Sequence, residues 1–521
     1  MPTLTVETKV DVPTRDGVTL ATTLFRPAGP GGSPAILMRT PYDRTTYSSE
    51  TLQVHASALA AAGYAVVLQD VRGRGESEGH FSPFVNERSD GIDTLEWIAG
   101  QPWSNGEVGL AGISYNAFTQ LAIVATNHEA VRCWVPGLSP SDVRTSWIRR
   151  NGLLDLGFHL AWALGAIAST DARTADAKEL LAAFESPVET ARRGPNDQPE
   201  LQSTPAANWF FDWVGSEDPY PGDDGVPTVM DIATIKAPAL VVAGWYDVFS
   251  AGSIELFETL QQGSNSRGHR LVAGPWDHSG LPLGRRAGDR DFGLSASIDL
   301  HDLQLRWFDQ HLRGGDEVED DRVFITGKNE WWSGVVWPPS TENLTLHVTL
   351  EGELETAPSP RGSLEVSLDA EDPTPAVGGA TFPWEPVLRP GAFDQRWRQS
   401  RGDVLVFSGE ELSSPLVVAG SPRLDIPVET PAEDTPVVAT LVELERGGQV
   451  WNISDGFGLV DPATRVASFD LGPICHQFSP GSRVGLDIAF AADVRVGPAV
   501  ARSCFIELER GPGWLTLPVI A

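Results

Sequence analysis

Three side chains in this sequence have the types and the order needed for nucleophilic catalysis: Ser114, Asp247 and His278. Ser114 lies at the apex of a turn, two residues after Gly112, between an apolar run and the helix-compatible stretch 116–126. A strand that turns sharply into a helix holds a serine hydroxyl clear of its sheet and directs the first N–H groups of the helix at the atom under attack. Gly112 lets the backbone pass close to this turn. The segment therefore predicts a serine nucleophile.

A lone serine in such a turn is most often structural, so the interpretation depends on two later segments. Asp247 follows the apolar run 239–243, and His278 follows the apolar run 271–274. Both side chains therefore lie just past the C-terminal end of a predicted parallel strand, the edge of an open α/β sheet where catalytic groups collect. Ser, Asp, His is also the chain order of α/β-hydrolases. Because an imidazole activates a serine and a carboxylate orients the imidazole, the three residues predict a catalytic triad.

The acid of this triad has alternatives. Asp247 is also suited to cap a helix that begins near Ser250. Asp277 is a second candidate for the acid, but it adjoins His278 in the sequence, and neighbouring side chains on a turn tend to diverge. A single histidine is often structural as well. The joint position of the acid and the base after successive strands favours Asp247 and His278.

Several further segments accompany the three candidate residues: 39–44, the Asp-x-Arg-Gly-x-Gly-x-Ser-x-Gly motif at 70–79, 97–106, the acid and base segments at 244–247 and 274–278, and, toward the C-terminus, 372–373, 377–379, 394–395 and 401–405. With these segments the chain resembles the CocE/NonD family of serine hydrolases over nearly its whole length. Ala117 departs from the family, because it stands where the motif G-x-S-Y-x-G ends in glycine.

The resemblance implies further site residues. The Tyr42 hydroxyl and the backbone N–H of Tyr115 would form the oxyanion hole, and Trp147 and Trp162 correspond in spacing to acyl-pocket tryptophans. Phe249 is a third candidate for the wall of the pocket. Tyr42 could instead be a turn tyrosine with its hydroxyl in water, and the three pocket candidates could simply pack in a core. The implied chemistry needs no metal and no organic cofactor.

The composition bounds the partners and the compartment. The formal net charge of −32 and the isoelectric point of about 4.6 disfavour nucleic acid and anionic membranes as main partners. Cys133, Cys475 and Cys504 are widely spaced among apolar neighbours, which is typical of buried free thiols in a reducing compartment. Residues 1–10 lack the features of a signal peptide, and no run reaches the roughly 18 apolar residues of a membrane span. We therefore expect a cytoplasmic protein; whether it forms a homo-oligomer stays open.

Three regions differ in their pattern. Residues 1–142 and 232–340 alternate strand and helix signals, which predicts one discontinuous α/β-hydrolase domain. Between them, residues 143–231 show no strand pattern and are rich in apolar and helix-forming residues. The pattern at 147–168 predicts a helix. We interpret this insertion as a helical cap over the strand ends. Residues 341–521 contain short alternating segments between turns, which predict a β-sandwich that the resemblance makes a jelly roll.

These features favour a serine hydrolase that cleaves a carboxylic ester or amide bond of a small molecule through an acyl-enzyme. One alternative is an Xaa-Pro dipeptidyl-peptidase or an α-amino-acid ester hydrolase or acylase. Such an enzyme needs a buried carboxylate to hold the ammonium group of the substrate. A non-enzyme alternative is a catalytically silent jelly-roll protein that binds carbohydrate or another protein, and the intact triad argues against it. The carboxylates considered for the ammonium group are Asp142, Asp155, Asp212, Glu217 and Asp218.

Overall fold

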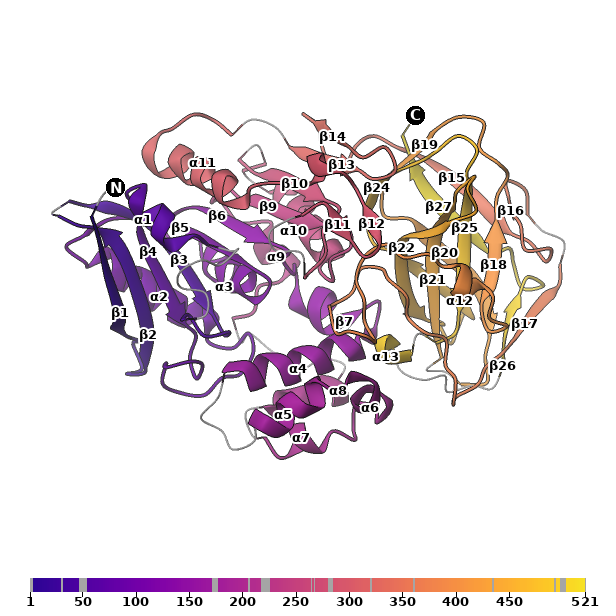
Figure 1. Ribbon diagram of the computed structural model, residues 1–521, viewed down its shortest axis with the longest axis horizontal. Coiled ribbons are helices and arrows are strands. Elements are labelled where there is room, and N and C mark those ends of the chain that lie inside the picture. Colours follow the sequence, from indigo (N-terminus) through magenta and orange to yellow (C-terminus); the bar gives the residue numbers. More distant parts are fainter. Residues whose placement is uncertain are drawn as a thin grey trace.

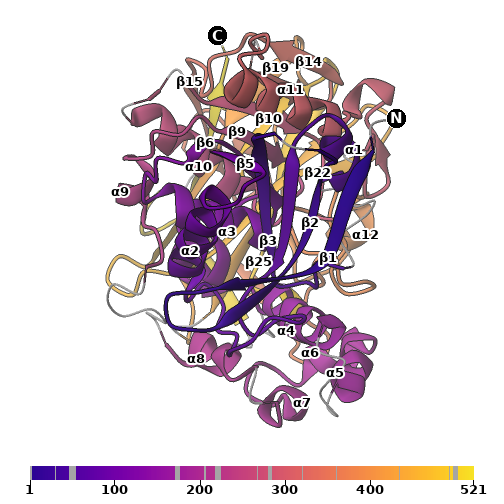
Figure 2. The ribbon, with the colours of Figure 1, turned by 90° about the vertical axis from the view of Figure 1, so that its left-hand side faces the viewer.

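The computed structural model divides into a part built on a large sheet, a group of helices beside it, and a β-rich part that contains the C-terminus (Figure 1). The turned view also places helices α4 to α8 together at one end of the molecule (Figure 2). The structure describes residues 3–29, 31–45, 54–170, 177–204, 207–216, 225–263, 265–266, 268–279, 284–318, 321–358, 361–432, 435–491, 493–496 and 503–520.

The large sheet has ten strands in the order β1-β2-β4-β3-β5-β6-β9-β10-β13-β14. From β4 to β13 in this order, neighbouring strands are parallel, as the alternating pattern predicted. The strands at the two edges pair antiparallel, because short turns join β1 to β2 and β13 to β14. These antiparallel edges were not predicted. The strands are β1 (Leu4–Pro13), β2 (Thr19–Pro27), β3 (Ser33–Thr40), β4 (Ala65–Asp70), β5 (Ser104–Ile113), β6 (Val131–Gly137), β9 (Leu240–Gly244), β10 (Arg270–Gly274), β13 (Arg322–Ile325) and β14 (Glu330–Ser333).

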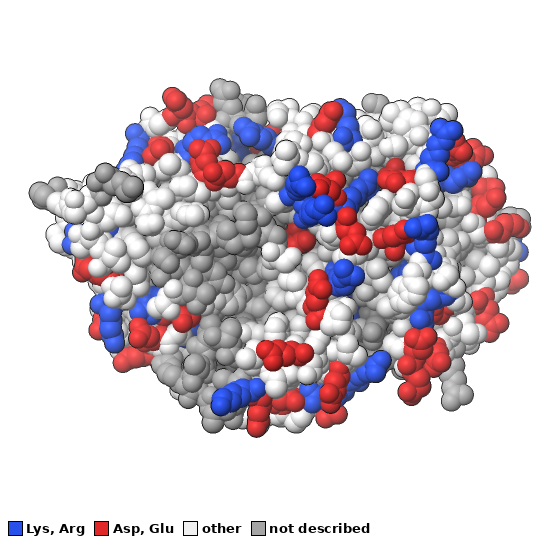
Figure 3. Space-filling view, in the orientation of Figure 1, with Lys and Arg blue, Asp and Glu red and all other residues white. Residues whose placement is uncertain are grey.

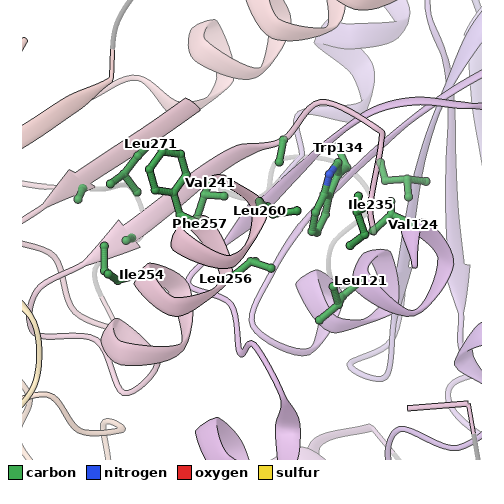
Figure 4. Close-up of a cluster of buried hydrophobic side chains, with 14 of the residues drawn as sticks. Leu121, Val124, Trp134, Ile235, Val241, Ile254, Leu256, Phe257, Leu260 and Leu271 are labelled. Atoms are coloured by element: carbon green, nitrogen blue, oxygen red, sulfur yellow. The ribbon is translucent and has the colours of Figure 1, made fainter. Parts of the chain in front are cut away.

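Helices cover both faces of this sheet because successive strand residues point to opposite faces and both sets are apolar. In β9, Val241 packs under α3 (Tyr115–Val124) and α10 (Ser250–Gln262), while Leu240 and Val242 join the cluster on the other face. Figure 4 shows the first cluster, in which Leu121 and Phe257 lie on the two helices that pack against this face of the sheet. The remaining helices of this part are α1 (Ala56–Ala61), α2 (Glu87–Ala99) and α11 (Leu300–Arg313), with a 3-10 turn at Leu294–Ala296 and short strands β11 (Arg286–Ala287) and β12 (Arg290–Asp291).

The insertion between β6 and β9 is mainly helical, but the helix predicted over residues 147–168 is wrong in its first third. A π-turn at Arg144–Ile148 leads into a hairpin, and the helix begins only at Leu156. The two loop residues of the hairpin, Asn151 and Gly152, have φ values of 49° and 83°. An Asn-Gly pair favours this tight turn, but apolar residues nearby, such as Trp147, Ile148 and Leu153, favoured a helix. The elements are β7 (Arg149–Arg150), β8 (Leu153–Leu154), α4 (Leu156–Thr170), α5 (Ala177–Phe184), α6 (Pro187–Arg192), α7 (Pro199–Gln202), α8 (Trp209–Gly215) and α9 (Val229–Ile232).

The β-rich part consists of two sheets that enclose one apolar core. Its strands alternate between buried and more exposed residues, which explains why short strands could be predicted there. One sheet contains β15 (Glu342–Val348), β16 (Leu354–Glu355), β17 (Ser363–Ser367), β19 (Leu416–Gly420), β20 (Arg423–Glu429), β23 (Val466–Asp470), β24 (Ile474–Phe478), β26 (Ser503–Glu507) and β27 (Trp514–Val519); the other contains β18 (Leu405–Ser408), β21 (Pro436–Leu444), β22 (Val450–Leu459) and β25 (Arg483–Ala489); α12 (Arg396–Gln399) and α13 (Asp493–Val496) connect them.

Three expectations from composition can be compared with the structure. Cys133, Cys475 and Cys504 are free and buried, as predicted. Among the helices of the described residues, none combines the length and the apolar character that a membrane span requires. On the face drawn in Figure 3, the described lysines and arginines lie interspersed with aspartates and glutamates. This distribution gives the face no large basic area that would favour nucleic acid.

Candidate active site

Ser114 occupies the sharp turn between β5 and α3. Its backbone has φ 64° and ψ −128°, a conformation that non-glycine residues seldom adopt and that strand-to-helix nucleophile turns require. The Ser114 N–H donates to the Gly137 carbonyl of the neighbouring strand at 3.0 Å. At Gly112, where φ is 143°, a Cβ atom would lie 2.6 Å from the Asn116 Cβ, so glycine is needed for this close approach. The turn leaves Ser114 6% exposed.

His278 and Asp247 meet Ser114 at the C-terminal edge of the sheet. The His278 Nε2 lies 3.0 Å from the Ser114 Oγ, and its Nδ1 lies 2.6 Å from the Asp247 Oδ2. The register of β9 and β10 pairs Gly244 with Gly274, so the two segments that carry the acid and the base leave the sheet at the same level. Asp247 is fully buried, which makes its charge effective toward the imidazole. This arrangement can move the serine proton to the imidazole while the carboxylate orients the ring.

The two alternatives considered for the acid were Asp277 as the partner of His278 and Asp247 as a helix cap. Asp277 directs one carboxylate oxygen at the backbone N–H and the hydroxyl of Ser279, at 2.8 and 2.5 Å. Asp247 accepts a hydrogen bond from the Phe249 N–H at 2.7 Å through its second oxygen. The carboxylate of Asp247 therefore serves the turn before α10 and the histidine together.

Tyr42 follows β3 in a loop that several buried contacts hold. The Tyr42 N–H donates to the Thr40 Oγ1 at 3.1 Å, and the Arg74 guanidinium donates to the Pro41 carbonyl at 3.0 Å. The Tyr42 hydroxyl accepts a hydrogen bond from the Trp162 indole N–H at 2.9 Å. A hydroxyl that accepts such a bond is a stronger donor through its own proton. The tyrosine is thus partly buried and anchored to α4, unlike a turn tyrosine with its hydroxyl in water.

The three pocket candidates come from separate elements and lie together. Trp147 in the π-turn has its ring centroid 4.6 Å from that of Phe249 and 5.3 Å from that of Trp162 in α4. The Phe249 ring lies 5.5 Å from the His278 ring. All three aromatic side chains are almost fully buried. They form a continuous aromatic layer next to the base, and their burial also suits packing in a core.

Phe382 is a site neighbour that the sequence analysis missed. Its ring centroid lies 5.3 Å from that of His278 and 5.2 Å from that of Phe158. The residue before it, Thr381, pairs through its backbone with Asp247. Both residues lie in the chain segment that follows β17, far beyond the strands of the large sheet. The nearby signature at 377–379 was the one local signal that pointed to this segment.

Charged groups from the insertion and from the β-rich part hold that segment in place. The Ala380 N–H donates to the Asp455 carboxylate at 2.9 Å, and the Ala380 carbonyl accepts from Arg495 at 2.9 Å and from Arg150 at 3.3 Å. Arg495 also contacts both Asp455 and Asp155. We call this group the junction cluster: Arg150, Asp155, Asp455 and Arg495. The cluster links the insertion and the β-rich part to the loop that contacts the base.

Comparisons with known proteins agree with this architecture. Residues 16–280 match the X-Pro dipeptidyl-peptidase (S15 family), and residues 316–493 match the X-Pro dipeptidyl-peptidase C-terminal non-catalytic domain. Two solved structures share the fold over almost the whole chain. An aminopeptidase from a marine sediment archaeon, Thaumarchaeota archaeon, has a TM-score of 0.81 at 21% identity and covers 100% of this chain and 96% of its own. An α-amino acid ester hydrolase has a TM-score of 0.76 at 22% identity and covers 99% of this chain and 97% of its own.

A curated relative extends the match to sequence. The cocaine esterase of Rhodococcus sp. (strain MB1 Bresler) is 31% identical, over 99% of this chain and 98% of its own length. The match to this relative therefore includes both the part built on the large sheet and the β-rich part. The chain belongs to the S15 peptidase family and is a serine hydrolase related in sequence to cocaine esterase.

Proposed function

We propose that this hydrolase cleaves carboxylic esters through an acyl-enzyme formed on Ser114. The observation that carries the proposal is the continuous contact from the Ser114 Oγ through the His278 ring to the Asp247 carboxylate. Nδ1–H donates to Asp247, which leaves Nε2 able to take the serine proton as the oxygen attacks the ester carbonyl. The imidazolium then protonates the leaving alcohol, and the neutral ring activates a water that releases the acid.

The oxyanion of the tetrahedral intermediate would be held by the Tyr42 hydroxyl and the Tyr115 backbone N–H. The Tyr115 N–H belongs to the first residue of α3, directly after the nucleophile, where helix N–H groups point outward. The anchoring of Tyr42 by Trp162 supports its assignment as the second donor. Each such donor contributes about 2.7–4 kcal/mol to stabilisation of the transition state.

Esters are favoured over substrates with a free amino group because the described candidate carboxylates are engaged or exposed. Asp142 accepts from the Arg144 backbone and side chain, and Asp155 is buried against Arg150 and Arg495. Asp212 is exposed on α8. A substrate ammonium would have to compete with these arginines. The other two carboxylates considered for this role, Glu217 and Asp218, lie outside the described residues.

We propose the same domain division as the sequence pattern: an α/β-hydrolase domain at 1–142 and 232–340, a helical cap at 143–231, and a jelly roll at 341–521. Trp147 of the insertion contacts Phe249, whose ring in turn contacts His278, and this supports the role of the insertion as a cap over the site. In this proposal Trp147, Trp162 and Phe249 form walls of the acyl pocket. The free cysteines support a reducing, cytoplasmic setting, and the acidic charge supports a small-molecule partner over nucleic acid or membrane.

Two substrates separate the proposed activity from its alternatives. We expect rapid hydrolysis of p-nitrophenyl butyrate and slow hydrolysis of Ala-Pro-p-nitroanilide by the full-length chain. Preference for the anilide would overturn the ester assignment in favour of a dipeptidyl-peptidase. Failure to hydrolyse either substrate, with no labelling by a fluorophosphonate probe, would favour the catalytically silent binding protein. The variants Ser114→Ala and His278→Ala should each abolish turnover with little change in the melting temperature.

A further inference from the structure

Glu87, the first residue of α2, has a buried carboxylate that contacts the residue after the nucleophile. Its Oε2 accepts a hydrogen bond from Arg39 at 2.7 Å, and its Oε1 lies 3.1 Å from the Tyr115 hydroxyl. The side chain is 4% exposed. Burying a carboxylate is costly unless it is paired and hydrogen-bonded. The contact with Tyr115 therefore belongs to a highly constrained group.

The direction of the hydrogen bonds around the Tyr115 hydroxyl is fixed by their donors. The Phe84 backbone N–H can only donate, and it donates to the Tyr115 oxygen at 2.7 Å. The phenol in turn donates its own proton to Glu87. Glu87 accepts this bond, and the two bonds fix the ring at its polar end. The aromatic neighbours of Tyr115 fix the ring along its faces and edges.

Tyr115 is in ring contact with the residue that anchors Tyr42. Its ring is nearly parallel to that of Trp162, with centroids 5.9 Å apart and an interplanar angle of 13°. Trp162 donates its indole N–H to the Tyr42 hydroxyl at 2.9 Å. A continuous series of contacts thus runs from Glu87 through Tyr115 and Trp162 to Tyr42. This series includes both groups assigned above as oxyanion donors.

We propose that Glu87 is a positioning residue for the oxyanion hole. Its carboxylate holds the Tyr115 side chain, and through it the Tyr115 N–H and the Trp162 ring that anchors the Tyr42 hydroxyl. Glu87 contacts neither the substrate nor the reacting atoms. This inference rests on the proposed function, because it assigns a task only if the Tyr42 and Tyr115 donors stabilise an oxyanion.

The expected effect falls on the transition state. Oxyanion donors act at about 2.7–3.1 Å from the position that the charged oxygen reaches, and a misplacement of about 1 Å costs roughly 100-fold in rate. Ester binding before attack does not depend on these donors to the same degree. Loss of the Glu87 contact should therefore lower kcat and leave KM nearly unchanged. A residue needed only for folding would not produce this separation.

The test compares wild type, Glu87→Gln, Tyr115→Phe and the double variant in the full-length chain. The control is Asp93→Asn, because Asp93 is another buried carboxylate of α2 and pairs with Arg15, away from Tyr115. The measurements are kcat and KM for p-nitrophenyl butyrate, the melting temperature, and the inhibition constant of phenylboronic acid. The boronate forms a tetrahedral adduct with the serine, so its affinity reports on the oxyanion hole.

We expect Glu87→Gln and Tyr115→Phe each to lower kcat by roughly 10- to 100-fold. The boronate inhibition constant should rise by a similar factor, and KM should stay within about twofold. The double variant should lose less than the product of the two single losses, because both variants weaken the Glu87–Tyr115 contact, whereas Tyr115→Phe also removes the acceptor of the Phe84 N–H. Asp93→Asn should keep the wild-type kcat and boronate affinity. Tyr115→Phe leaves the Glu87–Arg39 pair in place, so it tests the contact even if Glu87→Gln does not fold.

Three outcomes would overturn the proposal: an unchanged kcat in Tyr115→Phe, additive losses in the double variant, or an equal loss of kcat in Asp93→Asn. In each of these cases wild type still hydrolyses the ester, so the proposed function survives. Wild type that neither hydrolyses the ester nor reacts with a fluorophosphonate at Ser114 would contradict the proposed function, and the inference about Glu87 with it.

Discussion

The two sides of Ser114 are built differently. The side proposed to hold the oxyanion, with Tyr42 and Tyr115, is held by contacts within the large sheet, its helices and α4 of the insertion; we call it the oxyanion side. The base side, with His278 and Asp247, is in contact with Thr381 and Phe382 from the segment that leads into the rest of the β-rich part. Ser114 therefore lies between a side organised by nearby elements and a side completed by a distant part of the chain.

This difference assigns a role to the β-rich part. The junction cluster fixes Ala380, the residue before Thr381, through both its N–H and its carbonyl. Because Thr381 pairs with Asp247, any shift of this segment reaches the acid and the base directly. Residues 316–493 match a domain described as non-catalytic. In this chain, Thr381 and Phe382 of that region contact the groups proposed to do the chemistry. We infer that the base side depends on the docking of the two parts.

The largest expected effect tests the base side at its centre. Asp247→Asn removes the charge that orients His278 and supports the imidazolium, so kcat should fall by about 10⁴-fold. The matched control, Asp277→Asn, should lower kcat by no more than about tenfold, because Asp277 directs its carboxylate at Ser279. Steady-state kinetics on p-nitrophenyl butyrate measures both. A larger loss in Asp277→Asn than in Asp247→Asn would exchange their assigned roles.

The next effect tests the oxyanion side. Tyr42→Phe removes one proposed donor and should lower kcat by roughly 10²- to 10³-fold with the fold intact. Trp162→Phe tests the anchor of Tyr42, because it keeps an aromatic ring and removes the N–H that donates to the Tyr42 hydroxyl. We expect a smaller loss in Trp162→Phe than in Tyr42→Phe. Wild-type kcat in Tyr42→Phe would contradict the assignment of its hydroxyl.

A smaller effect on rate tests the junction cluster. Arg495→Met leaves Asp155 and Asp455 with fewer partners in a buried setting and should destabilise the folded chain by about 3–5 kcal/mol. It should also lower kcat by roughly tenfold through the segment that carries Thr381. Arg423→Met is the control, because Arg423 forms an exposed ion pair with Asp470, which contributes about 0–1 kcal/mol. Equal stability of the two variants in urea titrations would exclude the cluster as the anchor.

The smallest effect is a pH dependence of stability on the oxyanion side. Burial raises the pKa of Glu87 from 4.5 to about 7; Arg39 opposes this rise and Asp90 adds to it. Arg72, which pairs with Asp90, is the next charged neighbour, and Tyr115 faces the carboxylate from α3. The folded state holds this proton more tightly than the unfolded chain does. The free energy of unfolding should therefore fall as pH rises from 4.5 to 7.

Glu87→Gln isolates this contribution because it removes the titrating group. The stability of wild type relative to Glu87→Gln should be higher at pH 5 than at pH 8, by about 3 kcal/mol at most. Urea titrations of both proteins at the two pH values measure the difference. A difference that is constant with pH, or larger at pH 8, would show that burial does not raise the pKa of this carboxyl group.

The contrast between the two sides also explains what the sequence could predict. Ser114, Asp247 and His278 follow apolar strands directly, so local patterns located them and the parallel order of the sheet implied that they meet. Phe382 and Glu87 have no comparable local signal, because their positions beside the site depend on tertiary packing. The hairpin at Asn151 was predictable from the Asn-Gly pair, but the apolar residues around it favoured a helix.

Labelling by a fluorophosphonate probe tests the central claim most directly, because the probe reacts with a serine only when its base is in place. We expect the folded wild-type chain to carry one equivalent of label on the peptide that contains Ser114. His278→Ala, with an unchanged melting temperature, should lose this labelling. Label on another residue, or equally fast labelling of Ser114 without His278, would contradict the account.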